Sequence, residues 1–130
     1  MRVILSLAIF LTVVACAPAE DAESIAQSFV EQYYVAPDLS KAKALAYGLA
    51  RHKIEEEQRL LQTMDRGDGR ADRDVSYTLQ QTQQVGRDKM FFVYNITISV
   101  DRLVMKKRAT IATGKTGEGW RVTNFQESDI

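Results

Sequence analysis

The sequence predicts an α+β fold, in which two N-terminal helices pack on one face of a four-stranded antiparallel sheet. Apolar residues recur every three or four positions up to about residue 64, and from residue 75 they alternate with polar ones. Short connections between the alternating segments favour antiparallel pairing, and helices that precede such a sheet cover one of its faces. With 130 residues, 45% of them hydrophobic, the composition is that of one small globular domain.

The first helix is predicted over residues 22–36. Ile25, Phe29 and Tyr33 fall four positions apart and form one apolar stripe, which is widened by Ala22, Ala26 and Val30. Pro37 disfavours helical geometry at the residue before it, so the helix ends there.

The second helix is predicted as one continuous element from about residue 40 to Met64, with Asp38 or Ser40 as its N-cap. Gly48 lies inside this helix, where glycine costs about 1 kcal/mol relative to alanine. The side expected to be buried consists of Ala42, Leu45, Ala46, Leu49 and Ala50.

The charged part of the second helix predicts ion pairs at four-residue spacing. The pairs are Arg51 with Glu55, Lys53 with Glu57, and Glu55 with Arg59. We interpret this segment as a solvated helix face, and its alternative is an acidic docking surface for a partner.

Four strands follow a charged loop at residues 65–74. They are predicted over residues 75–85, 90–100, 103–113 and 120–125, with a glycine-rich hairpin loop at 114–119.

Nucleotide and nucleic-acid binding are not expected. The stretch ATIATGKTGEGW contains the letters of a phosphate loop, but an alternating strand follows it, whereas phosphate binding requires a helix to begin there. Lys+Arg and Asp+Glu both number 17, so no net positive field would attract nucleic acid.

Metal, cofactor and catalytic sites have little support. The single histidine, His52, has Glu56 four residues away, but two ligands without a third are weak evidence for a metal site. No nucleophile motif accompanies this histidine, so we assign no catalytic, cofactor or metal residue. Acid–base chemistry by one His or Asp in a pocket is the enzymatic alternative that remains.

The N-terminus predicts a signal peptide over residues 1–15. Arg2 precedes an apolar run that is too short to cross a membrane. The only cysteine, Cys16, follows Val13-Val14-Ala15, and this segment resembles the lipobox of bacterial lipoproteins. The resemblance implies cleavage before Cys16, lipidation of its thiol, and a tether over residues 16–21. Because the next residue is Ala17 rather than aspartate, it also implies the periplasmic face of the outer membrane.

Residues 22–130 are predicted to form one domain, of which about residues 22–127 resemble an NTF2-like (cystatin-like) domain of the kind found in uncharacterised bacterial lipoproteins. The segments that carry the likeness are AESIAQSFVEQYY, MFFVYNITISV and GEGWRVTNFQES. The resemblance implies a cone of helices on a curved sheet, in a superfamily of isomerases, dehydratases, binding subunits and assembly proteins. Its enzymes usually place a His–Asp or Tyr–Asp pair inside the cone, and no residue of this chain can be carried over as such a pair.

We therefore expect a membrane-anchored, non-catalytic module that binds a small apolar ligand or an envelope protein. The alternatives are a small pocket hydrolase or isomerase and a structural homodimer. The candidate pocket-lining residues are Tyr33, Tyr47, Tyr94 and Trp120.

Overall fold

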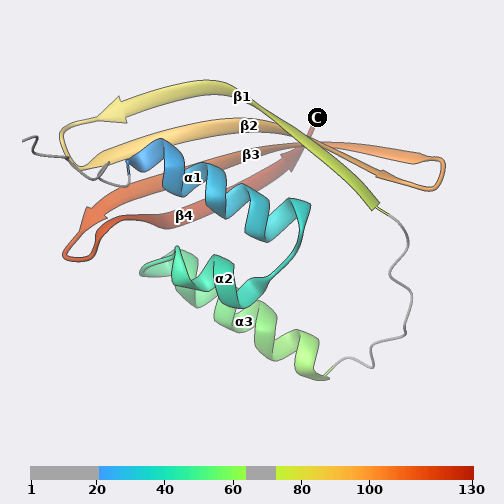
Figure 1. Ribbon diagram of the computed structural model, residues 1–130, viewed down its shortest axis with the longest axis horizontal. Helices are drawn as coiled ribbons and strands as arrows, with labels where there is room; N and C mark the ends of the chain where they lie inside the picture. The colour runs from blue at the N-terminus through green and yellow to red at the C-terminus, as the bar shows by residue number, and fades with distance from the viewer. Residues whose placement is uncertain (1–20, 64–72) are drawn as a thin grey trace, which may run out of the picture.

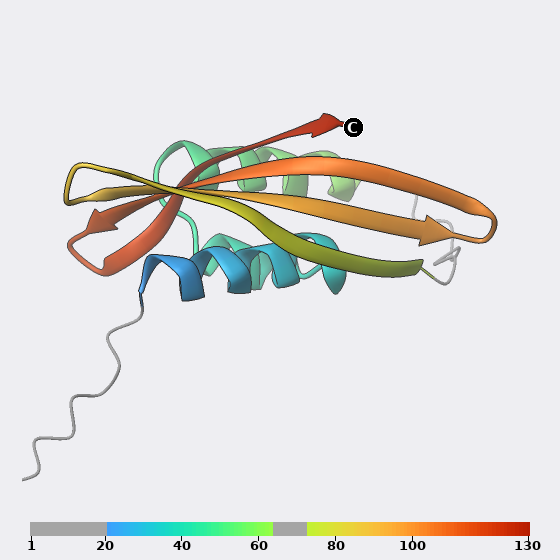
Figure 2. The same ribbon diagram turned by 90° about the horizontal axis from the view of Figure 1, so that it is seen from above.

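A curved, four-stranded antiparallel sheet is covered by helices on one face in the computed structural model, which describes residues 21–63 and 73–130 (Figures 1 and 2). The strands are β1 (Arg73–Val85), β2 (Lys89–Val100), β3 (Leu103–Thr116) and β4 (Gly119–Asp129), and they are ordered β1-β2-β3-β4. The predicted α+β architecture is confirmed.

The first helix changes its winding before it ends. The α-helix α1 (Ala22–Val30) is capped by Asp21, whose side chain accepts a 2.7 Å hydrogen bond from the Ser24 backbone N–H. The next turn, η1 (Glu31–Val35), is a π-helix, and it stops before Pro37 as predicted. A π turn spreads its residues over a wider arc, and such turns occur frequently at functional sites.

The predicted second helix is broken into α2 (Leu39–Ala44) and α3 (Leu49–Thr63), so the expectation of one continuous helix was wrong. Gly48 has a φ of 60°, which belongs to the left-handed conformation that glycine adopts easily. This conformation does not occur inside an α-helix, so the helix is interrupted at Gly48. The break lets the backbone around Tyr47 pair with β4, because Tyr47 N–H donates to Val122 O and Val122 N–H donates to Leu45 O, both at 2.8 Å.

This break also decides which side chains of the segment are buried. Ala42, Ala46 and Ala50 are buried as expected, but Leu49 is 53% exposed, so its predicted burial was wrong. Asp38, one of the two predicted caps, accepts a 3.1 Å hydrogen bond from the Lys41 backbone N–H.

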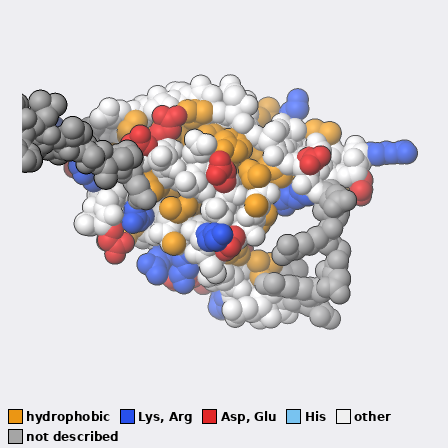
Figure 3. Space-filling model, in the orientation of Figure 1, with side chains coloured by type: hydrophobic (Ala, Val, Ile, Leu, Met, Phe, Trp, Pro, Cys, Tyr) orange, Lys and Arg blue, Asp and Glu red, His pale blue; other side chains and the backbone are white. Residues whose placement is uncertain are grey.

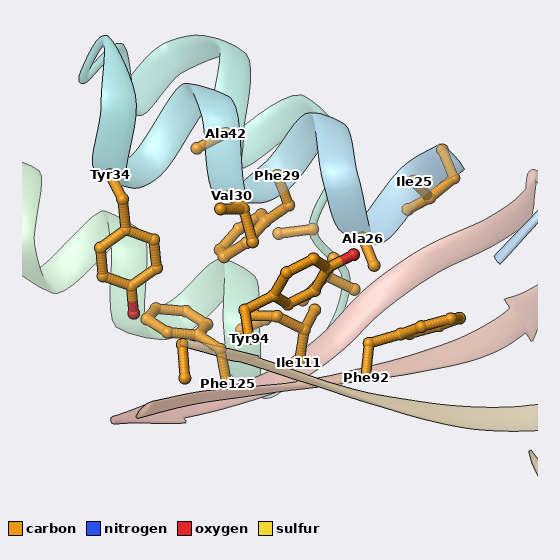
Figure 4. Packing of buried hydrophobic residues seen from close by; sticks show 14 of the residues in the cluster. Ile25, Ala26, Phe29, Val30, Tyr34, Ala42, Phe92, Tyr94, Ile111 and Phe125 are labelled. Carbon is orange, nitrogen blue, oxygen red and sulfur yellow. The ribbon is translucent and has the colours of Figure 1, made fainter. Parts of the chain in front are cut away.

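The core lies between α1, α3 and the covered face of the sheet. Tyr94 and Phe92 point from β2 toward α1, beside Ile111 of β3 (Figure 4). The alternation predicted for the second strand is confirmed, since Phe92, Tyr94, Ile96 and Ile98 are all buried. In the space-filling view, hydrophobic side chains appear along the middle of one face and charged ones are scattered around them (Figure 3).

The last hairpin is tighter than predicted. Thr116 pairs with Gly119, so only residues 117 and 118 form the turn, and β4 extends to Asp129. The phosphate-loop letters therefore lie in a β-hairpin and no helix follows them. The register shifts between Ala112 and Thr113, and this bulge leaves Thr123 of β4 without a partner in the ladder.

The proposed signal peptide (1–15), Cys16 and most of its tether lie outside the described residues, as does most of the charged loop at 65–74. Among the helices that are described, none is long and apolar enough to cross a membrane.

Candidate functional site

A pocket of about 450 Å³ opens where the π turn, α3 and the C-terminal half of β4 meet. Pockets for small molecules typically have volumes of about 300–1,000 Å³. Six residues from these elements line it: Tyr33, Lys53, Glu57, Phe125, Gln126 and Glu127.

A short hydrogen bond joins the π turn to α3 at this pocket. The Tyr33 hydroxyl donates to Glu57 Oε2 at 2.6 Å. Burial and the adjacent Glu57 carboxylate raise the pKa of Tyr33 well above its usual value of 10. The Tyr33 hydroxyl therefore keeps its proton at neutral pH and acts as a hydrogen-bond donor.

Lys53 connects α3 to β4. Its ammonium donates to Asn124 Oδ1 at 2.7 Å and to the Phe125 carbonyl oxygen at 2.8 Å, and it lies 5.2 Å from the centre of the Phe125 ring. The Lys53–Glu57 ion pair expected from spacing was wrong, because Lys53 turns toward the strand and Glu57 toward Tyr33.

The other two ion pairs expected on this helix had different outcomes. The predicted Arg51–Glu55 pair is confirmed at 3.4 Å. The predicted Glu55–Arg59 pair was wrong, since Arg59 pairs with Glu56 at 2.7 Å. The solvated face is therefore only part of this helix surface, because Lys53 and Glu57 on its other side line the pocket.

A buried hydroxyl adjoins the pocket wall. Tyr34 is only 4% exposed, and its hydroxyl has no hydrogen-bond partner among the described residues. Burial and then the nearby Glu127 carboxylate raise the pKa of Tyr34. Glu127 itself pairs with the Lys107 ammonium at 3.2 Å.

Aromatic rings form the inner side of the site. Tyr33 stacks on Phe29 with the ring centres 5.5 Å apart. The centre of the Tyr33 ring also lies 4.8 Å from that of Tyr34 and 4.9 Å from that of Phe125. The wider π turn allows the consecutive residues Tyr33 and Tyr34 both to face inward, and Figure 4 shows the Tyr34 hydroxyl beside Phe125.

The residues predicted to line a pocket are placed at different points. Tyr33 lies at the pocket, whereas Tyr94 is 2% exposed in the core and Trp120 packs against the edge of that core. Tyr47 is 53% exposed at the break between α2 and α3.

Sequence reasoning missed most of the site. The four-residue spacing predicts a solvated position for Lys53 and Glu57, and the sequence indicates no role for Glu127. The available signal was the apolar pair Ala50 and Ile54, because Lys53 and Glu57 each follow one of them by three residues and therefore flank the buried side of α3. No group of three or more metal-binding side chains occurs in the part of the chain that the structure describes, and His52 is exposed on α3.

Comparison with solved structures identifies the fold. The chain is similar to a ketosteroid isomerase-like protein from Erwinia carotovora atroseptica, with a TM-score of 0.60, 14% identity, and coverage of 88% of this chain and 98% of that one. It is also similar to a domain of unknown function with a cystatin-like fold from Nostoc punctiforme, with a TM-score of 0.59 and 9% identity. That match covers 82% of this chain and 74% of the other.

No protein-family model and no curated protein matches the chain. The structural matches carry the fold, since identities of 14% and 9% are too low to carry function. The helices and the four-stranded antiparallel sheet have the NTF2-like, cystatin-like fold that the sequence resemblance implied.

Proposed function

We propose that this chain is a lipid-anchored envelope protein that binds a small ligand in the pocket between the π turn, α3 and β4. The observation that carries the binding role is the convergence of polar groups from three elements on one cavity of about 450 Å³. The anchor is supported by the Cys16 context in the sequence.

Binding is favoured over catalysis because the polar groups of the pocket are engaged with one another. Tyr33 donates to Glu57, and Lys53 donates to Asn124 and to a backbone carbonyl. A ligand can be held by the remaining capacity of these groups without any proton transfer.

Native mass spectrometry of the protein, purified from the envelope of its own cell, tests the binding role. We expect an adduct of small mass, which is retained in Glu56→Gln and reduced in Glu57→Gln. Glu56 pairs with Arg59 and does not line the pocket, so it controls for the lost charge. A protein without any adduct contradicts ligand binding, and a dimer without an adduct favours the structural homodimer.

Cys16→Ser tests the anchor. We expect the wild-type protein to remain with the membrane after a high-salt wash and to carry the mass of a diacylglycerol. The Cys16→Ser variant loses that mass. A wild-type protein that carries no lipid and does not remain with the membrane would overturn the anchoring proposal. That result would not affect the proposal that the pocket binds a ligand.

A second candidate, a small isomerase, is favoured by the Tyr33–Glu57 contact. A protonated hydroxyl 2.6 Å from a carboxylate inside a cavity supplies a donor and a base side by side. The similarity to a protein named ketosteroid isomerase-like agrees with this chemistry. Incubation with simple ketones in D₂O tests this candidate. If Glu57 removes a proton from the carbon next to the carbonyl, that carbon takes up deuterium from the solvent. We expect Glu57→Gln to abolish the uptake.

A further inference from the structure

We propose that the ligand of this pocket is a small organic cation, whose ammonium group pairs with the carboxylate of Glu57. This inference rests on the proposed binding function and adds the chemical class of the ligand. It follows from the charges at the pocket, from a buried hydroxyl at its wall, and from the aromatic rings beside it.

The charges leave one carboxylate without a cation. Lys53 directs its ammonium at Asn124 Oδ1 and the Phe125 carbonyl, and Glu127 is paired with Lys107. Glu57 receives only the neutral hydroxyl of Tyr33, and it has no ion pair within the described ranges 21–63 and 73–130. Among the charged side chains that line the pocket, the carboxylates of Glu57 and Glu127 outnumber the ammonium of Lys53 by two to one, so the pocket favours a cation over a carboxylate ligand.

The buried hydroxyl of Tyr34 lies at the wall of the pocket. Tyr34 is 4% exposed, and its hydroxyl lies near the Glu127 carboxylate but has no hydrogen-bond partner by distance and angle among the described residues. Buried polar groups are nearly always hydrogen-bonded, so an unpaired one calls for an explanation. Glu127, the carboxylate near this hydroxyl, lines the pocket, so a ligand bound there lies beside both groups.

The rings at the pocket suit the same ligand class. Ring faces attract ammonium groups, and Lys53 already shows this behaviour at 5.2 Å from the Phe125 ring centre. Tyr33 and Phe125 supply apolar surface next to Glu57. A suitable ligand therefore has an ammonium group that pairs with Glu57 and a short hydrophobic part that contacts the two rings. Benzylamine has this form and serves as the probe.

The test compares the binding of benzylamine, benzyl alcohol and benzoate to the purified protein by ligand-observed NMR. The three probes share a ring and differ in charge. We expect benzylamine to bind at least tenfold more tightly than benzyl alcohol, and benzoate not to bind. Benzylamine affinity falls as salt rises because the contact is ionic.

Two glutamine variants assign the cation to Glu57. Glu57→Gln preserves side-chain shape and an acceptor for Tyr33, and we expect it to weaken benzylamine at least tenfold while benzyl alcohol is unchanged. Glu56→Gln removes the same charge from the next residue, which pairs with Arg59 outside the pocket, and it leaves the affinity within twofold of wild type. Circular dichroism verifies that both variants are folded.

Each contrary result has a separate meaning. Equal binding of benzylamine and benzyl alcohol, or equal losses in Glu57→Gln and Glu56→Gln, overturns the cation inference and keeps a binding pocket. Failure of all three probes also overturns the cation inference, while the native adduct still decides whether the protein binds a ligand. Tight binding of benzoate would show that the pocket prefers an anion, and it would overturn the cation inference.

Discussion

We expect Tyr94 to make the protein less stable in alkali, and the size of the effect follows from the rise of its pKa on burial. Burial, the charge of Glu23 and the neighbouring Tyr77 raise the pKa of Tyr94 to about 12, against 10 for the free side chain. A raised pKa means that the folded state holds the proton more tightly, so this stabilisation is complete below pH 10 and is lost as pH rises through 12. The full loss is about 3 kcal/mol, of which about 1 kcal/mol has been lost by pH 11.

The assay is urea unfolding at pH 7, 9 and 11, followed by the fluorescence of Trp120. Because lysines also lose charge near pH 11, the wild type is compared with Tyr94→Phe, which keeps the ring in the core. We expect the wild type to lose about 1 kcal/mol more than Tyr94→Phe between pH 9 and pH 11. Tyr47→Phe changes an exposed tyrosine and should follow the wild type. Parallel losses in the wild type and Tyr94→Phe would refute the reasoning.

Three further changes test the packing and the site. Gly48→Ala forces a φ of 60° on a residue with a Cβ and should lower stability by about 1 kcal/mol, with Gly48→Asn less affected; thermal unfolding measures both, and equal stabilities would contradict the strain. Ile111→Ala empties a fully buried position and should cost about 2–5 kcal/mol in urea unfolding, so a loss below 1 would place Ile111 outside the core. Lys53→Met releases Asn124 and the Phe125 carbonyl and should cost about 1 kcal/mol, with faster amide exchange in β4; exchange at the wild-type rate would show that the contact is not formed.

The sequence predicts the fold because periodicity determines which side chains face the core. The alternation around Phe92 and Tyr94 places both on the covered face, and the stripe around Phe29 buries α1 against them. The break at Gly48 could not be predicted this way. A glycine within a helical pattern is compatible with a costly continuous helix or with a left-handed turn, and the pairing of Tyr47 with β4 decides between them.

The pocket was less predictable because its groups come from segments far apart in the sequence. Lys53 and Glu57 have the spacing of a surface ion pair, and that local pattern carries no information about Asn124 or Tyr33. Their true partners lie 71 and 24 residues away, so only the tertiary fold brings them together.

Two irregular parts of the backbone lie next to this pocket, whereas the register shift between Leu79 and Gln81 of β1 and the break at Gly48 lie away from it. The π turn carries Tyr33 and Tyr34, and the β4 bulge at Thr123 precedes the acceptor of Lys53. π turns and bulges redirect side chains and occur frequently near functional sites. The Tyr34 hydroxyl beside the pocket has no hydrogen-bond partner among the described residues, and the same is true of Asn95 Oδ1 on β2. The two irregularities and this hydroxyl adjoin one cavity, which is lined by Glu57, Glu127 and aromatic rings, and this arrangement agrees with the ligand binding that we propose.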